Sequence, residues 1–189
     1  ASDVYKRQSP HRAEPDCPAY PRCGGCALRH MDYEEELSLK LQRVNDALHR
    51  IGKLDFSVSG ILPAPEDARQ RRKVIFNVAE QNGRPVAGFY RARSHEVVPV
   101  PDCPAVPKEA LACAQTVLDW MEREHIPVYD EAAKRDGVRH IFYRSSHLTE
   151  KAVLTLTASR SPGEKALGIL TDMLLSLIHI SEPTRLGMI

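Results

Sequence analysis

The chain has 189 residues, which is long enough for one domain or two small ones with a real hydrophobic core. Hydrophobic residues make up 42% of it and charged residues 27%, as in ordinary globular proteins. The formal net charge of +1 excludes a strongly basic protein, so any contact with RNA or DNA has to come from a local patch. The apolar stretch at residues 173–180 is too short to cross a bilayer, and we expect no membrane contact.

Three of the five cysteines lie close together in the segment CPAYPRCGGC. Cys17, Cys23 and Cys26 have the spacing C-x5-C-x2-C, and Cys103, in VPVPDCPAVP, is a candidate fourth ligand. A Gly-Gly turn lets the last two thiolates of the segment reach one metal centre. The pattern predicts a four-thiolate site with a loop over residues 15–30, and spacing alone leaves an iron–sulfur cluster and zinc both open. Disulfides are the alternative, but they need an oxidising compartment and the chain shows no signal peptide.

The predicted strands come in runs that helices separate along the chain. Residues 33–50 predict a helix that Asp32 caps, with an apolar stripe that we expect to pack in a core. Residues 56–62 predict a strand, and residues 73–79 and 86–91 predict a β-hairpin around an Asn-Gly turn. The later elements are a strand over 96–100, a helix over 107–124, a loop over 128–137, strands over 138–144 and 152–158, and a helix from about 164. This order predicts an α+β fold, an antiparallel sheet with packed helices.

The two ends of the chain differ in character from the rest. Residues 3–8 (DVYKRQ) and 175–180 (LSLIHI) can be encoded by codons that are reverse complements of each other. Both ends also resemble translated transposase adapter from a sequencing library. We therefore expect residues 1–8 and 175–189 to be adapter read-through and residues 9–174 to be a fragment of a longer protein.

Basic side chains concentrate at the outer ends of the predicted hairpin and beside a later strand. Because the outer ends of a hairpin meet, the groups before its first strand and after its second should converge. Guanidinium groups match phosphate oxygens bidentately, so this end of the sheet could bind RNA or DNA. A solvated sheet edge protected by charge is the alternative. The candidate RNA-binding residues are Arg71, Arg72, Lys73, Arg91, Arg93, Arg139 and Arg144.

Four segments in this order, CPAYPRCGGCALRHMDYEEELSLK, RRKVIFNVAE, GFYRARSHEVVPVPDCP and VRHIFYR, resemble the RNA uracil-5-methyltransferase family. The resemblance covers about residues 17–158 and is nearest to the bacterial 23S rRNA (uracil-5-)-methyltransferases that carry a [4Fe–4S] cluster. Members run from an RNA-binding TRAM domain, through a central cluster domain, to a methyltransferase domain that binds S-adenosylmethionine. The resemblance implies that residues 9–174 are the central domain and that the TRAM and catalytic domains are absent from this sequence.

The resemblance also implies a specific cofactor and activity. It favours a [4Fe–4S] cluster over zinc on Cys17, Cys23, Cys26 and Cys103. The parent would be a cytoplasmic enzyme that methylates 23S rRNA with S-adenosylmethionine. The chain has no Gly-rich cofactor loop, P-loop or nucleophile elbow, so we predict no catalytic or S-adenosylmethionine-binding residue in it and no activity of the fragment alone. A tRNA uracil-5-methyltransferase of the same family and a non-enzymatic zinc or iron–sulfur RNA-binding module are the alternatives.

Overall fold

The computed structural model describes the chain in two compact units. The described residues are 9–64, 71–130, 132–146, 148–149 and 151–181. The first unit takes its described residues from 9–20 and 26–64, and the second from 21–25 and 71–181. The cysteine segment is therefore divided between the units. The adapter prediction for residues 1–8 and 175–189 stays a prediction, and residues 1–8 and 182–189 of it lie outside the described residues.

The first unit is built on one helix. Helix α1 (Tyr33–Asp46) continues into a π-helical turn, η2 (Ala47–Ile51), and together they confirm the predicted helix. Asp32 caps it as predicted, because its carboxylate accepts a hydrogen bond from the Glu35 N–H at 2.8 Å. The core-packing prediction for its apolar stripe is wrong, since neither α1 nor η2 contains a buried residue and Val44 is 48% exposed. Among the described residues of this unit no sheet is present to cover the stripe.

The strand predicted over residues 56–62 is also wrong. This segment forms no strand, and side chains from the helix form hydrogen bonds with its backbone groups. The Asn45 amide donates to the Val58 carbonyl at 3.1 Å and accepts from the Val58 N–H at 2.7 Å. The His49 ring bonds to the Phe56 carbonyl at 3.0 Å. A β-like sequence stays outside a sheet here because its backbone is paired with a helix instead of a strand.

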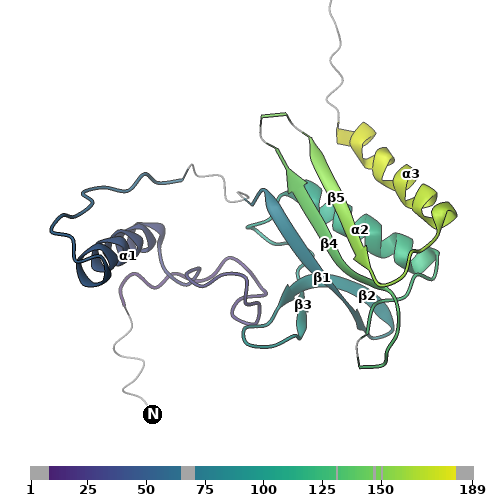
Figure 1. Ribbon diagram of the computed structural model, residues 1–189, viewed down its shortest axis with the longest axis horizontal. Coiled ribbons are helices and arrows are strands. Elements are labelled where there is room, and N and C mark those ends of the chain that lie inside the picture. Colours follow the sequence, from purple (N-terminus) through teal and green to yellow (C-terminus); the bar gives the residue numbers. More distant parts are fainter. Residues whose placement is uncertain (1–8, 65–70, 131, 147, 150, 182–189) are drawn as a thin grey trace, which may run out of the picture. The chain divides into compact units, whose positions relative to one another are not determined.

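The second unit contains a five-stranded antiparallel sheet with the order β3-β2-β1-β4-β5 (Figure 1). The hairpin turn at Asn82 and Gly83 has positive φ angles of 52° and 75°, as a tight hairpin requires. The predicted hairpin and the later strands are thus confirmed. The strands are β1 (Lys73–Gln81), β2 (Arg84–Tyr90), β3 (Val97–Pro99), β4 (Val138–Ser145) and β5 (Ala152–Ala158).

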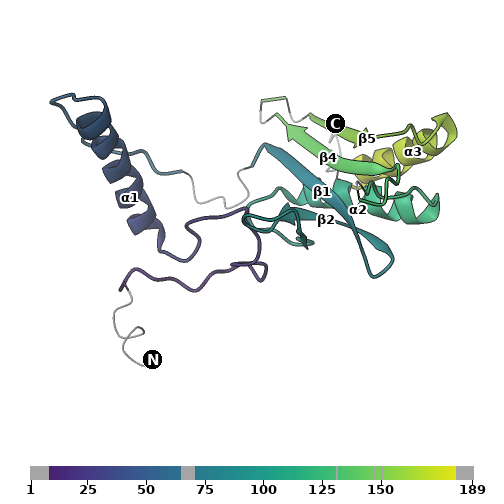
Figure 2. The ribbon, with the colours of Figure 1, turned by 60° about the horizontal axis from the view of Figure 1, so that its bottom comes forward.

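Two helices complete the second unit, so the α+β prediction is confirmed. Helix α2 (Lys108–Arg123) crosses behind the sheet in Figure 1, and α3 (Glu164–Ser181) lies beside α2 (Figure 2). Trp120 is fully buried, and its indole N–H donates to the Ala166 carbonyl at 2.8 Å, which joins the two helices. Within the described part of the chain, no helix has the length and apolar character needed to cross a membrane. The core between α2 and the sheet includes Val74, Phe76, Val117, Trp120, Met121, Ile141 and Tyr143.

Candidate functional site

The four predicted cluster ligands are shared equally between the two units. Cys17 and Cys26 belong to the first unit, whereas Cys23 and Cys103 belong to the second. None of the five cysteines forms a disulfide, and Cys103 is buried, with 6% exposure. Among the described residues, no group of three or more His, Cys, Asp or Glu side chains is placed to hold a metal ion. The four-cysteine site therefore stays a prediction.

In the second unit, the loop of residues 21–25 lies against the end of β2. The Gly24 N–H donates to the Tyr90 carbonyl at 3.0 Å, and Cys23 forms an antiparallel bridge with Arg91. A Cβ atom at position 24 would lie 2.8 Å from the Tyr90 carbonyl oxygen and 2.9 Å from the Ala92 nitrogen. Glycine is required here by this close backbone approach, because no larger residue fits between the two chain segments.

Arg71 connects this loop to the segment that carries Cys103. Its guanidinium donates to the Gly25 carbonyl at 2.7 Å and lies over the Phe89 ring, 5.5 Å from the centroid. Its backbone N–H donates to the Ala105 carbonyl at 3.4 Å. One residue thereby links the two segments of the second unit that carry candidate ligands. This linking role has no sequence signal, because an arginine beside a strand does not indicate a distant carbonyl partner.

The donor chemistry at Cys23 fits a thiolate ligand. The Gly25 N–H donates to the Cys23 sulfur at 3.4 Å, and hydrogen bonds to the ligand sulfurs are a usual part of the surroundings of an iron–sulfur cluster. Cys103 is buried in a proline-rich segment, where the stiff backbone limits how far its sulfur can move. Both candidate ligand thiols of this unit therefore suit metal ligation.

In the first unit, Cys17 and Cys26 lie near the guanidinium of Arg29. Arg29 donates to both carboxylate oxygens of Asp16, and this pairing raises the pKa of Arg29 and lowers that of Asp16. Cys26 and Cys17 add smaller contributions that also raise the Arg29 pKa. A fixed positive charge therefore lies near both candidate ligand thiols of this unit. No sequence signal singles out Arg29.

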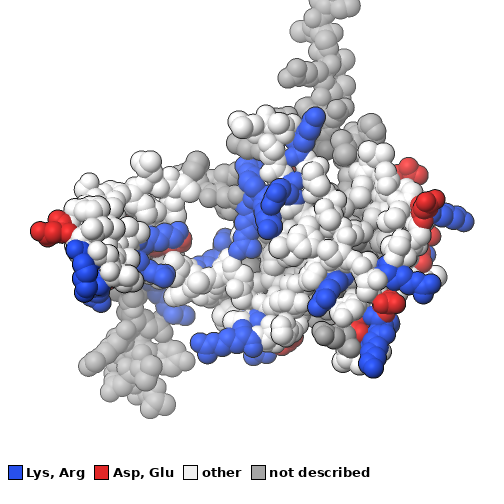
Figure 3. Space-filling view, viewed as in Figure 1, with Lys and Arg blue, Asp and Glu red and all other residues white. Residues whose placement is uncertain are grey.

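The candidate RNA-binding residues fall into different environments. Lys73 and Arg144 are direct partners in the register of β1 and β4. Figure 3 shows Lys and Arg side chains gathered over the end of the sheet where β1 begins and β4 ends. Arg91 forms an ion pair with Glu96 at 3.1 Å. The guanidinium of Arg139 lies over the Tyr129 ring, 4.7 Å from the centroid.

The other two candidates lie close to these groups in the chain. The Arg72 carbonyl accepts a hydrogen bond from the Ser145 N–H at 2.9 Å, which extends the pairing of the two central strands. Arg93 is exposed and has a φ angle of 59°, in the turn between β2 and β3. Contact with RNA stays a prediction for all seven residues.

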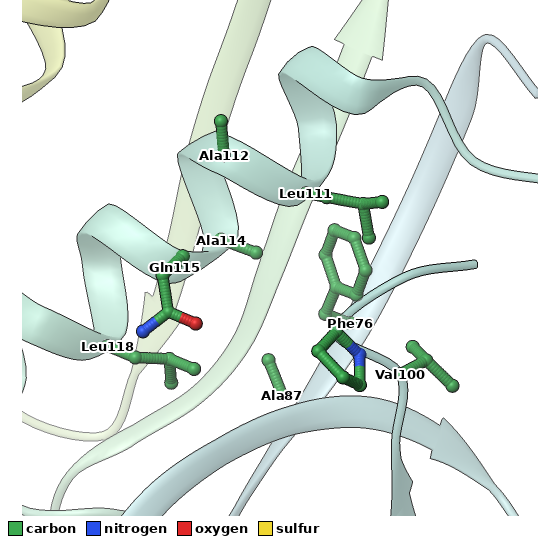
Figure 4. Close-up of a pocket in the computed structure, with 9 residues that line it drawn as sticks. Phe76, Ala87, Val100, Leu111, Ala112, Ala114, Gln115 and Leu118 are labelled. Carbon is green, nitrogen blue, oxygen red and sulfur yellow. The ribbon is translucent and has the colours of Figure 1, made fainter. Parts of the chain in front are cut away.

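A pocket of about 220 Å³ lies between α2 and the sheet (Figure 4). Phe76 and Leu111 line it, and Gln115 supplies its polar side chain. The Gln115 amide donates to Asp119 at 2.8 Å. The nine lining residues include no titratable side chain, so this pocket offers no acid–base chemistry.

Comparison with known proteins identifies relatives over most of the chain. No family model matches. The chain is 32% identical over 177 residues to an uncharacterized RNA methyltransferase of Clostridium tetani, a match that covers 92% of this chain and 38% of the relative. An uncharacterized RNA methyltransferase of Listeria innocua is 32% identical over 152 residues, or 80% of this chain and 34% of the relative. The chain belongs to the RNA methyltransferase family of these relatives.

A solved structure confirms the fold and agrees with the predicted family. The tRNA (uracil-54, C5)-methyltransferase of Pyrococcus abyssi, solved with S-adenosyl-L-homocysteine, superposes with a TM-score of 0.64. The match has 21% identity and covers 86% of this chain and 36% of that one. This structural likeness shows the fold alone, and the sequence relatives are what confirm the predicted relation to RNA methyltransferases. The chain spans about a third of the length of these relatives, between 34% and 38% of them.

Proposed function

We propose that this chain is part of an S-adenosylmethionine-dependent 23S rRNA uracil-5-methyltransferase. In the parent protein, a methyl group would pass from S-adenosylmethionine to carbon 5 of a uracil in RNA. The observation that carries this proposal is the similarity to RNA methyltransferases over 92% of the chain. The chain itself would contribute an iron–sulfur cluster and part of the RNA-contacting surface, and the enzyme would act in the cytoplasm.

The proposed cofactor is one [4Fe–4S] cluster on Cys17, Cys23, Cys26 and Cys103. An N–H donor at the Cys23 sulfur and the Arg29 guanidinium near Cys17 and Cys26 support thiolate ligation. Methyl transfer of this kind moves no net electrons, so the cluster would have no redox role in it. When bound, the cluster would supply a rigid cross-link among its four ligands. The chain's own contribution is to hold the thiols, through the contacts of Gly24, Arg71 and Arg29.

The proposed RNA-contacting surface is the basic end of the sheet in the second unit. Lys73 and Arg144 support it most directly, because they lie side by side in the register of the strands. Arg71 is a weaker candidate for phosphate binding because its guanidinium already donates to a carbonyl. The residues proposed to contact RNA at this end are Arg71, Arg72, Lys73, Arg91, Arg93 and Arg144. Arg139, which is also proposed to contact RNA, lies near the start of β4, at the other end of that strand.

The cluster is tested by purifying the chain without oxygen and measuring iron, sulfide, zinc and visible absorption. We expect about four irons and four sulfides per chain, as a cubane cluster requires. Cys103→Ser should abolish the visible absorption, whereas the matched control Cys113→Ser should retain it, because Cys113 lies on α2 outside the proposed ligand set. One tightly held zinc in a colourless protein would contradict the cluster and favour the zinc-module alternative.

The substrate is tested on the full-length parent protein with labelled S-adenosylmethionine. We expect methyl incorporation into a 23S rRNA transcript at a uracil, and none when the present chain is used alone. Incorporation into tRNA but not rRNA would contradict the rRNA assignment and establish the tRNA alternative. No incorporation into either RNA would favour a non-enzymatic RNA-binding module.

A further inference from the structure

One face of the sheet in the second unit is turned away from α2. Successive residues of a strand point to opposite faces, and in β1 the buried residues Val74, Phe76 and Val78 point toward α2. The alternate positions make up what we call the open face, and Figure 3 shows it toward the viewer. Its central members are Lys73, Ile75 and Asn77 of β1, His140, Phe142 and Arg144 of β4, and Val153, Thr155 and Thr157 of β5.

The open face carries a hollow of about 460 Å³ lined by residues of β1, β4 and β5. Phe142 lies in the middle of this lining, and its cross-strand partner is Thr155. Lys73 and Arg144 are cross-strand partners next to the pair of Ile75 and Phe142 on the same face, and they line the same hollow. An aromatic ring, two cations and a hydroxyl group therefore converge on one shallow site.

The Phe142 ring is held in place from one side. The His140 ring meets it edge-on, with the centroids 5.9 Å apart and an angle of 73° between the planes. The His140 Nδ1 is 3.0 Å from the Thr157 hydroxyl oxygen. Burial, with a smaller effect from Arg139, lowers the pKa of His140, so its ring is neutral near pH 7. The aromatic surface is thus positioned before any ligand binds.

The charge on this part of the sheet suits an anion. Glu80 is the only acidic residue in the five described strands, and it shares the face of Val74 and Val78 instead of the open face. Its carboxylate pairs with Arg135 at 2.9 Å. No strand carboxylate of the described chain therefore opposes an anion at Lys73 and Arg144.

We propose that the open face binds a nucleotide of single-stranded RNA, with its base stacked on Phe142 and its adjacent phosphates on Lys73 and Arg144. Stacking on an aromatic side chain needs an unpaired base, whose flat surface a duplex would hide. The threonine hydroxyls along β5 can bond to base edges or to the ribose. This inference rests on the proposed RNA function and adds an aromatic contact to it.

The test measures binding of the 189-residue chain to a short labelled single-stranded RNA by fluorescence anisotropy. Phe142→Ala should weaken binding about tenfold without changing the salt dependence, because it removes stacking and no charge. Lys73→Gln and Arg144→Gln should each lower the slope of log affinity against log salt by about 0.7, the value for one phosphate contact on a single strand. The matched controls are Phe56→Ala, at an exposed phenylalanine of the first unit, and Lys165→Gln, at an exposed lysine of α3.

A second variant separates lost binding from lost folding. Phe142→Trp should keep the affinity and place an indole in the hollow, where a stacked base quenches its fluorescence. The native Trp120 is fully buried and should not respond. The Phe142→Ala protein should also have the same far-ultraviolet circular dichroism spectrum as the unaltered 189-residue chain, which would show that it is folded.

Each outcome bears on a distinct claim. Tight binding that neither Phe142 variant alters, with no quenching, would overturn the stacking site and leave the proposed RNA function intact. No binding of single-stranded RNA by the unaltered chain would overturn both this site and the proposed RNA-contacting surface. Equal weakening of duplex RNA binding by Phe142→Ala would contradict base stacking.

Discussion

Replacing Gly24 with alanine tests whether the cysteine loop of the second unit depends on close backbone packing. The added Cβ would lie 2.8 Å from the Tyr90 carbonyl oxygen, 2.9 Å from the Ala92 nitrogen and 3.1 Å from the Ala92 Cα. All three are backbone atoms, so no side-chain rotation can relieve the overlap. The loop of residues 21–25 must therefore move away from the end of β2.

The size of the effect follows from the contacts that this movement breaks. The loop would lose the bond from the Gly24 N–H to Tyr90, worth about 1 kcal/mol net. It would also strain the bond from the Arg71 guanidinium to Gly25, a charged bond worth about 1.5–3 kcal/mol. Because the loop is only partly buried, we expect the free energy of opening the loop to fall by about 2 kcal/mol in total. This change raises the equilibrium constant for loop opening roughly 30-fold.

Hydrogen exchange of the backbone amide at position 24 measures this opening directly. We expect exchange in Gly24→Ala to be roughly 30-fold faster than in the unaltered chain, with the sheet amides unchanged. Gly60→Ala is the matched control, since nothing lies within 4 Å of the Cβ it would add. Equal protection at position 24 in both proteins would refute the packing argument.

Two further predictions concern one helix of each unit. The hydrogen bond from the Glu35 N–H lowers the pKa of Asp32, so the charged cap should stabilise α1 at neutral pH. This stabilisation should be lost as the pH falls through the lowered pKa. Asp32→Asn, which keeps a capping side chain but has no charge, should remove that pH dependence of the helix content. Unchanged acid sensitivity would contradict this role. Trp120→Phe should lower the free energy of unfolding by about 1–2 kcal/mol, because the Ala166 carbonyl loses its donor, and Trp120→Ala by about 3–5 kcal/mol through the added cavity. Chemical denaturation followed by circular dichroism measures both, and a Trp120→Phe protein of unchanged stability would show that the bond contributes nothing.

Local sequence signals were sufficient for most of the second unit. The Asn-Gly pair predicts the hairpin because its residues tolerate the positive φ angles found at Asn82 and Gly83. Alternating apolar residues predict β1 and β4, and the helical period predicts α2, because burial of one face imposes those periods. In the first unit the same signals gave two wrong predictions, the packing of the helix stripe in a core and the strand over residues 56–62. Its apolar stripe and its β-like segment each need a partner surface, and the described residues of this unit supply only the helix itself.

The sequence by itself determined the order of the helices and strands, the Asp32 cap, the cysteine spacing and the family resemblance. Each of these depends on neighbours a few residues apart, or on a motif that can be read directly. The tertiary structure alone decided that Gly24 must be glycine, that Arg71 joins the loop of Cys23 to the segment of Cys103, and that Phe142 lies next to the cross-strand pair of Lys73 and Arg144. Those facts depend on segments far apart in the chain that meet through backbone packing and strand register, and no local pattern encodes which atoms will meet.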